Sequence, residues 1–226
     1  GTTIIKVTDN TPEGLYYYCS IHSGMGNGIN LIDNASPEFT SSATYSADEN
    51  QTAIGTVTAT DAEGDAITYS ISGSEIEITS AGVLSFVAAP DYETKSSYSA
   101  TITANDGTSS STQDITVNIN NLNDNAPRFI CQGDPITVDE NQTSMTNCSS
   151  IATDADGDIN SLSFSLSGDD ASFFSINSAT GIPTFNVEPD YEERINFNIT
   201  LTVTDGSFTT SENFRVMINN LNDNAP

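Results

Sequence analysis

Short acidic motifs recur twice along the chain, in the same order, and they are the residues best suited to chemistry. The chain has 31 acidic and only 5 basic residues among 226, so these motifs have few basic partners. Carboxylate and amide oxygens are the ligands that hard cations such as calcium prefer. The matching segments are 48–51 with 139–142, 60–65 with 153–158, 90–93 with 189–192, 105–107 with 204–206, and 121–127 with 220–226. The repetition predicts cation sites at specified joints between two similar modules.

The segments between these motifs alternate apolar and polar residues. Ile115, Val117 and Ile119 alternate with polar neighbours, and segments 197–203 and 214–218 follow the same pattern. A period of two places one face of a strand in a core and the other in water. Short strands separated by Asp, Gly, Asn and Pro turns predict antiparallel β-sandwiches. No segment has a convincing helical period, so we expect an all-β chain.

The net charge of −26 excludes several partners. Nucleic acid and anionic membrane surfaces would repel such a chain. No apolar run approaches the roughly 18 residues that a membrane-spanning helix needs. The chain begins without Met and ends within a repeated motif, so we expect a fragment cut at both ends from a longer parent, and a missing export signal or anchor proves nothing.

The run from Asp154 to Asp158 invites comparison with a calcium-binding EF-hand loop. That loop requires Gly at its sixth position and Glu at its twelfth. Here Gly157 is the fourth residue and Ser165 the twelfth, so the EF-hand is rejected. No single loop in the chain supplies the six to eight oxygens that calcium takes. The ligands must therefore come from several segments.

The motifs, in this order and spacing, resemble cadherin repeats over residues 33–226. The resemblance implies two tandem Greek-key, immunoglobulin-like β-sandwiches of the cadherin type. We expect residues 33–127 to form the first repeat with its linker, and residues 128–226 to form the second. The resemblance also implies calcium as the cofactor, held where consecutive repeats meet.

For the joint between the two repeats, the resemblance implies ligands from three segments. The first repeat, the linker and the second repeat would contribute, in that order, Glu49, Asp91 and Glu93; Asn123, Asp124 and Asn125; and Asp154, Asp156 and Asp205. Without metal the clustered carboxylates would repel one another. We therefore expect the stiffness of the rod to depend on calcium.

The same resemblance implies two half-sites at the ends of the repeats. The N-terminal half-site would comprise Asp33, Asn34, Asp61, Glu63 and Asp106, and the C-terminal one Glu140, Asp190, Glu192, Asn222, Asp223 and Asn224. The family often has Asp where this chain has Asn121 and Glu63. The chain has no Trp, so the strand-swap adhesion found in the family is not expected of these two repeats.

Cysteines and glycosylation motifs bear on the cellular compartment. Cys131 and Cys148 flank the first strand of the second repeat, and they either close a disulfide loop or remain buried thiols. A disulfide would fit an extracellular setting. Asn-x-Ser/Thr motifs begin at Asn34, Asn50, Asn141, Asn147 and Asn198 and can carry glycans in a eukaryotic secretory host.

The first 32 residues do not follow the repeat pattern. Segments 2–8 and 14–20 predict two strands, and the spacing of Cys19, His22 and Met25 resembles the copper-ligand loop of cupredoxins. Blue-copper sites use two His, one Cys and a weak axial Met. His22 is the only His, so a copper site would be incomplete, and copper is a doubtful cofactor. The alternative interpretation is a Tyr-rich strand with an incidental Cys, His and Met.

Three classes of function remain to be compared. The first is a rod segment of a cell-surface or secreted adhesin, with neighbouring repeats, homophilic contacts or cell-surface ligands as partners. The second is the stalk of a secreted copper-binding electron carrier. The third is a hydrolase. No Ser-His-Asp or Cys-His set can form around a single His beside Cys19, and carboxylate pairs of the glycosidase kind, which the sequence does not exclude, are explained here by metal sites. We expect the first: a calcium-binding, extracellular, non-enzymatic chain.

Overall fold

The computed structural model describes residues 34–130, 135–145, 152–157 and 162–222, and the backbone of two short strands before them. These strands, β1 (Tyr16–Tyr18) and β2 (Gly26–Gly28), pair as an antiparallel hairpin. Strand β1 lies within the predicted segment 14–20, whereas the sequence does not predict its partner β2. The predicted strand 2–8 lies outside the described residues.

The chain divides into two units, Gly1–Asn120 and Asn121–Pro226, which are described separately. After the hairpin, the strands of unit 1 are β3 (Glu38–Phe39), β4 (Thr44–Asp48), β5 (Ala53–Thr56), β6 (Ala59–Thr60), β7 (Thr68–Ile71), β8 (Ile76–Ile78), β9 (Val83–Phe86), β10 (Ser97–Asn105) and β11 (Ser110–Asn120). They form sheets in the orders β4-β11-β10-β7, β5-β9-β8 and β3-β6. Strand β4 runs parallel to β11, and the other pairs are antiparallel.

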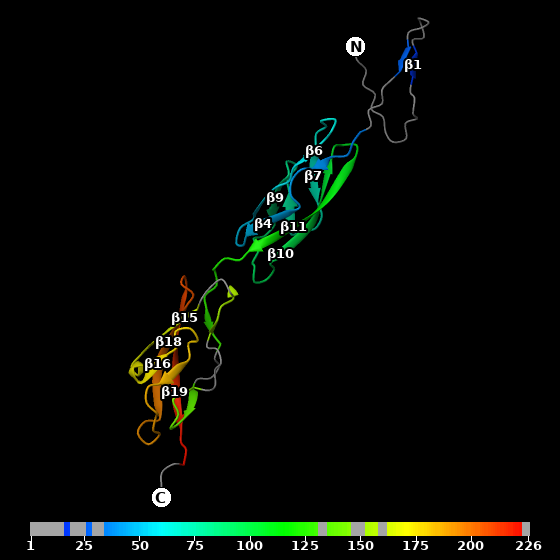
Figure 1. Ribbon diagram of the computed structural model, residues 1–226. Coiled ribbons are helices and arrows are strands. Elements are labelled where there is room, and N and C mark those ends of the chain that lie inside the picture. Colours follow the sequence, from blue (N-terminus) through cyan, green and yellow to red (C-terminus); the bar gives the residue numbers. More distant parts are fainter. Residues whose placement is uncertain are drawn as a thin grey trace. The chain divides into compact units, whose positions relative to one another are not determined.

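Unit 2 repeats this arrangement (Figure 1). Its elements are β12 (Arg128–Phe129), β13 (Ile136–Asp139), β14 (Ala152–Thr153), β15 (Ser163–Ser167), the 3-10 turn η2 (Ala171–Phe173), β16 (Phe174–Ile176), β17 (Pro183–Phe185), β18 (Asn196–Thr204) and β19 (Thr209–Asn219). The main sheet has the order β13-β19-β18-β15, with β13 parallel to β19. The pairs β16-β17 and β12-β14 complete the described part of the unit.

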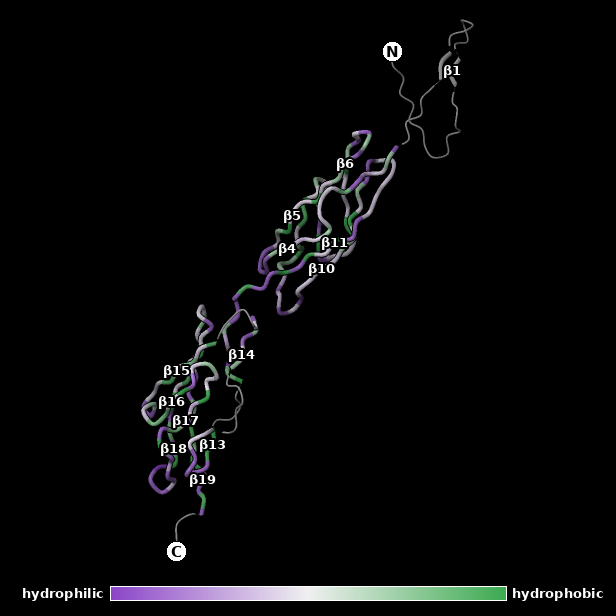
Figure 2. The backbone as a smooth tube through the Cα atoms, in the orientation of Figure 1, coloured by the Kyte–Doolittle hydropathy of each residue, from purple (hydrophilic) through white to green (hydrophobic). Residues whose placement is uncertain are grey.

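Each unit has its own core, built from alternate residues of facing sheets. In unit 1, Ile102 and Val117 from the main sheet are fully buried with Leu84 of β9. In unit 2, Val203 and Val216 occupy the corresponding interior. Hydrophobic and hydrophilic positions alternate along the strands (Figure 2). The predicted all-β sandwich class is therefore confirmed.

Candidate metal centre

A buried glutamate directly follows one strand of each unit, β4 in unit 1 and β13 in unit 2. Glu140, directly after β13, is 1% exposed, and its two carboxylate oxygens accept the backbone N–H groups of Tyr191 (3.0 Å) and Leu221 (2.6 Å). In unit 1 Glu49, directly after β4, is 2% exposed and accepts the N–H of Tyr92 at 2.7 Å. Burying a carboxylate is costly unless it is hydrogen-bonded. These glutamates are therefore held in place by the fold.

A tight turn brings each glutamate to the third acidic motif of its unit, which is 90–93 in unit 1 and 189–192 in unit 2. Asn50 and Asn141, one residue further on, both take a φ of 63°, a conformation that Asn tolerates better than most residues. Their backbone N–H groups donate to the carbonyl oxygens of Pro90 (2.9 Å) and Pro189 (3.0 Å). The structure thus joins motifs that are far apart in the sequence: Glu49 and Tyr92 are 43 residues apart, and Glu140 and Tyr191 are 51.

Three predicted ligands meet at this end of unit 2. Glu140, Asp190 and Glu192 each offer a carboxylate oxygen, and the three oxygens lie within 4.8 Å of one another. In unit 1, oxygens of Glu49 and Glu93 lie equally close. Carboxylates at such distances repel strongly unless a cation lies between them.

Asp91 and Asp190 fold the chain locally as well as supplying charge. Asp190 accepts the backbone N–H groups of Glu192 and Glu193. Asp91 accepts the Thr94 hydroxyl and its backbone N–H, and these bonds hold the pKa of Asp91 below its ordinary value. Asp91 is not in the close group of Glu49 and Glu93, unlike its counterpart Asp190.

At the opposite end of unit 2, the linker residues are bound to Asp156. Its side chain is buried and accepts both the backbone N–H of Asn125 (3.1 Å) and the side-chain amide of Asn125 (2.8 Å). Asn121 donates its amide to the carbonyl oxygen of Asp156 at 3.0 Å. The Asn125 amide also reaches Asp124 at 2.7 Å. The linker therefore lies against the acidic motif of the same unit.

Several side-chain oxygens at this end of unit 2 are buried and accept no hydrogen bond from the described residues. Among them are Oδ2 of Asp154, Oδ2 of Asp205 and Oδ1 of Asn121. The other oxygen of each aspartate is used: Asp154 accepts the N–H of Asp156, and Asp205 accepts the N–H groups of Ser207 and Phe208. Buried acceptors without donors are rare in proteins. A calcium ion would satisfy them.

The pKa values of these two aspartates shift in opposite directions, and only that of Asp154 indicates repulsion. Burial raises the pKa of Asp154, and the charges of Asp156 and Asp205 raise it further, against a hydrogen bond from the Asp156 N–H. Burial also opposes ionisation of Asp205. The N–H groups of Phe208 and Ser207 and the Asn123 amide outweigh it, so the pKa of Asp205 is lowered. Like charges are thus crowded into a partly dry site, which is the setting that a cation relieves.

The corresponding end of unit 1 is arranged differently. Oδ2 of Asp106 accepts hydrogen bonds from the Asn34 amide (2.9 Å) and from the Ser109 hydroxyl (2.9 Å). In the counterpart Asp205, the same oxygen has no donor from the described residues. The Ser109 N–H is the main cause that holds the pKa of Asp106 well below its usual range, and the Asn34 amide adds to it. Glu63 accepts the N–H of Ala35 at 3.1 Å. Only Oδ2 of Asp61 is buried there without a donor from the described residues.

Several predicted site residues lie outside the described residues. They are Asp33, Asp223 and Asn224 of the half-sites, the copper set Cys19, His22 and Met25, and the disulfide candidates Cys131 and Cys148. Of the other linker residues, Asn222 is exposed, and Asn123 donates its amide to Ser207 at 3.4 Å. Among the described helices, none is long and apolar enough to cross a bilayer.

Two asparagines are missing from the predicted ligand sets but take part in the site. Asn121 contributes the buried Oδ1 described above, and its counterpart Asn220 donates to Glu192 at 3.1 Å. Both occupy the first position of the repeated seven-residue linker. The two linkers have the same sequence, and this repetition could have added both asparagines to the predicted ligand sets.

Comparison with known proteins gives a consistent family. No family model matches the chain. Mouse cadherin EGF LAG seven-pass G-type receptor 2 is 29% identical over 88% of the chain, and mouse protocadherin-15 is 28% identical over 98%. Mouse cadherin-23 EC22-24 superposes with a TM-score of 0.68 at 25% identity, covering 84% of this chain and 66% of that one. Protocadherin gammaB7 EC3-6, described as a cis-dimer structure, also gives 0.68, at 30% identity over 85% of this chain and 52% of that one.

The chain spans only a small part of these curated relatives, 8% of the seven-pass receptor and 12% of protocadherin-15. The similarity therefore concerns the repeats and not the whole proteins. None of the relatives named here supports the resemblance to cupredoxins. The acidic motifs, the paired sandwiches and the similarity to solved extracellular repeats agree: the chain is built of cadherin repeats.

Proposed function

We propose that the chain is a calcium-binding rod segment in the extracellular part of a cell-adhesion protein. The observation that carries the proposal is the set of buried oxygens of Asn121, Asp154 and Asp205, which lack hydrogen-bond donors from the described residues. Calcium coordinates carboxylate and amide oxygens together, as this set would require. The close acids Glu140, Asp190 and Glu192 give a second, independent reason to expect the same cation.

In this proposal the two kinds of acidic end combine at each joint between repeats. Glu49, Asp91 and Glu93 would bind the same ions as Asp154, Asp156 and Asp205, with the linker residues 123–125 between them. Glu140, Asp190, Glu192 and residues 222–224 would serve a following repeat. Calcium would thereby stiffen the rod. The role is binding and mechanical rather than catalytic, and the cell surface is the expected location.

Calcium titration of the metal-free chain tests the binding claim directly. We expect saturable heat release with calcium, little with magnesium because its octahedral geometry is stricter, and a higher melting temperature in calcium than in chelator. Equal melting temperatures in calcium and in chelator would reject the proposal.

Proteolysis tests the claim that calcium orders the joint. We expect chelation to accelerate cleavage between residues 121 and 128, because like charges there would repel once the ion is removed. Cleavage within β10 or β18 should not change on the same time scale. Identical linker cleavage with and without calcium would contradict a shared site.

Adhesion is tested with beads that carry the chain. Homophilic adhesion predicts aggregates that form in calcium and disperse in chelator. Beads that bind calcium but never aggregate would exclude homophilic contacts by these repeats and leave a spacer role.

A further inference from the structure

Of the five Asn-x-Ser/Thr motifs, Asn198 differs from the others in its surroundings. Asn34 is half-buried, and its amide donates to Asp106 and Ser109. Asn50 and Asn141 are exposed, but each follows a buried glutamate of the acidic clusters and takes a positive φ. Asn147 lies outside the described residues. A sugar on any of the first three would disturb or crowd a candidate calcium ligand.

Asn198 is the third residue of β18, on the exposed face of the main sheet of unit 2. Its neighbours Phe197 and Ile199 point into the core, so its own side chain points to solvent. The side-chain amide makes no hydrogen bond to the described residues. Its backbone N–H donates to Asp170 at 2.7 Å, which anchors the strand without using the side chain. Attaching a group to this amide would therefore cost no native hydrogen bond.

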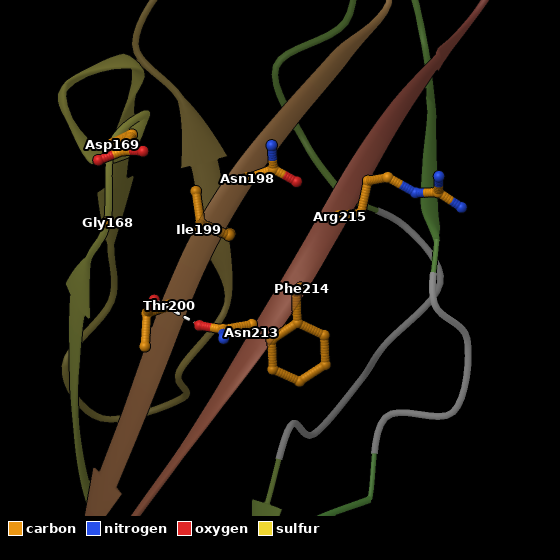
Figure 3. A pocket seen from close by; sticks show the side chains of 8 residues that line it. All are labelled: Gly168, Asp169, Asn198, Ile199, Thr200, Asn213, Phe214 and Arg215. Atoms are coloured by element: carbon orange, nitrogen blue, oxygen red, sulfur yellow. Dashed lines mark hydrogen bonds between the residues drawn. The ribbon is translucent and has the colours of Figure 1, made fainter.

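A shallow polar depression adjoins Asn198. Its walls come from the loop after β15 and from strands β18 and β19, with Gly168, Asp169, Thr200, Asn213 and Arg215 among the residues that line it (Figure 3). Asn198 is paired with Arg215 across the two strands. Thr200, the third residue of the motif, donates its hydroxyl to Asn213 at 2.7 Å (Figure 3). Amide, hydroxyl and carboxylate groups of this kind suit the hydroxyls of a sugar.

We propose that Asn198 is an N-glycosylation site, and that its first sugar lies in this depression on β18 and β19. The donor is a lipid-linked oligosaccharide pyrophosphate of the secretory pathway. A bond forms between Nδ2 of Asn198 and the anomeric carbon of the sugar, while the bond from that carbon to the pyrophosphate oxygen breaks. The amide loses one proton, and the lipid pyrophosphate leaves with the bonding electrons.

The proposal has a consequence for contacts with other molecules. A glycan on this face would cover the exposed surface of β18 and β19 in unit 2. Protein partners of that unit would then bind through other surfaces. The inference requires passage through a secretory pathway, which a eukaryotic expression host provides, so it can fail without affecting the calcium proposal.

Secretion of the chain from a eukaryotic host, with peptide mapping after enzymatic removal of N-glycans, tests the site. We expect the Asn198 peptide to carry a glycan, which is lost in Asn198→Gln and in Thr200→Ala. Thr200→Ser should retain it because Ser preserves the motif, and Asn196→Gln, which changes an exposed Asn outside any motif on the same strand, is the matched control. An unmodified Asn198 in the secreted, folded protein would overturn the proposal. Calcium-dependent melting of each variant verifies folding.

A second measurement tests the placement of the sugar. The side-chain amide NMR signals of Asn213 should shift between the glycosylated protein and the same protein after glycosidase treatment. The corresponding amide of Asn118, on a strand of unit 1, should not shift. Unchanged Asn213 signals would contradict a sugar in the depression.

Discussion

Asp205 shows how a single carboxylate can serve two purposes. One oxygen closes the turn between β18 and β19 by accepting two backbone N–H groups. The other is buried without a donor from the described residues. The turn therefore presents a fixed oxygen that an added cation would satisfy.

Asp205→Asn separates these two purposes, because Asn retains the oxygen that closes the turn and loses the charge. We expect calcium affinity to fall by at least about tenfold, as when an ionic contact worth about 1.4 kcal/mol is lost. Calorimetry measures the change. Glu212→Gln removes the same charge from an exposed position on β19 and should leave the affinity unchanged within error. Equal losses in both variants would show that only net charge matters.

The charge of Asp170 stabilises the fold of unit 2. Its buried carboxylate forms an ion pair with Arg194 at 2.6 Å and accepts the N–H of Asn198. Arg194 in turn lies over the ring of Phe197, 4.3 Å from its centroid. Burial disfavours the charged form, but the Asn198 N–H and the Arg194 guanidinium outweigh it, so the pKa of Asp170 is lowered.

The sign of this shift sets the pH dependence. A lowered folded-state pKa means that Asp170 stabilises the fold above its unfolded pKa of about 3.9, and that this contribution is lost as pH falls through the folded value. We expect Asp170→Asn to cost about 1–3 kcal/mol at neutral pH, from the loss of charged hydrogen bonds. Urea unfolding in chelator measures it, with the exposed Asp169→Asn as control. If Asp170→Asn lowered the free energy of unfolding as much at strongly acidic pH as at neutral pH, the stabilising role of the Asp170 charge would be contradicted.

At the scale of elements, periodicity predicted the long strands well and the short ones poorly. Strands β11, β18 and β19 alternate over most of their length, because one face of each packs against a facing sheet. Strands of two or three residues, such as β3 and β14, have too few residues to express a period. Their positions depend on pairing across the sandwich, which the sequence does not encode locally.

The candidate site also has a part that the sequence predicted and a part that it did not. The acidic residues and their grouping at repeat ends could be predicted, because their motifs recur. The partners of individual oxygens could not. Asn34 donates to Asp106, whereas Asn125 donates to Asp156. These pairings follow from the way each linker folds against its unit. Two similar motifs thus give different arrangements through tertiary contacts alone.

Gly82 illustrates an element that requires glycine for two reasons. It has a φ of +84°, and an added Cβ would collide with the carbonyl oxygen of Val57. Gly73 has a similar φ of +91° but open space around it. Gly73→Ala should therefore cost about 1 kcal/mol from backbone strain alone. Gly82→Ala should cost about 1–3 kcal/mol more, because the backbone at Val57 must move away from the added methyl group.

Both glycines lie in unit 1, and equilibrium urea unfolding measures the stability of the two variants. The two midpoints should be clearly separated, with Gly82→Ala the lower. If both variants lose the same stability, the close approach to Val57 carries no energy and the turn needs glycine only for its dihedral angle.

At the scale of the whole molecule, a net charge of −26 is itself a destabilising force, because like charges repel in the compact state. Calcium that binds only the folded chain opposes it, by about 2.7 kcal/mol at a concentration of one hundred times its dissociation constant. Sodium chloride opposes it differently, by screening, since the Debye length falls from about 30 Å at 0.01 M to about 8 Å at 0.15 M. Because calcium and sodium chloride reduce the same repulsion, their stabilising effects should not be fully additive.

We therefore expect the melting temperature in chelator to rise with sodium chloride, and to rise much less when calcium is saturating. The reason is that bound calcium neutralises the clusters, such as Glu140 with Asp190 and Glu192, where repulsion is strongest. Scanning calorimetry over a series of salt concentrations, with and without calcium, measures both slopes. Equal slopes would mean that the repulsion is spread over the surface and that the acidic clusters do not set the stability of the chain.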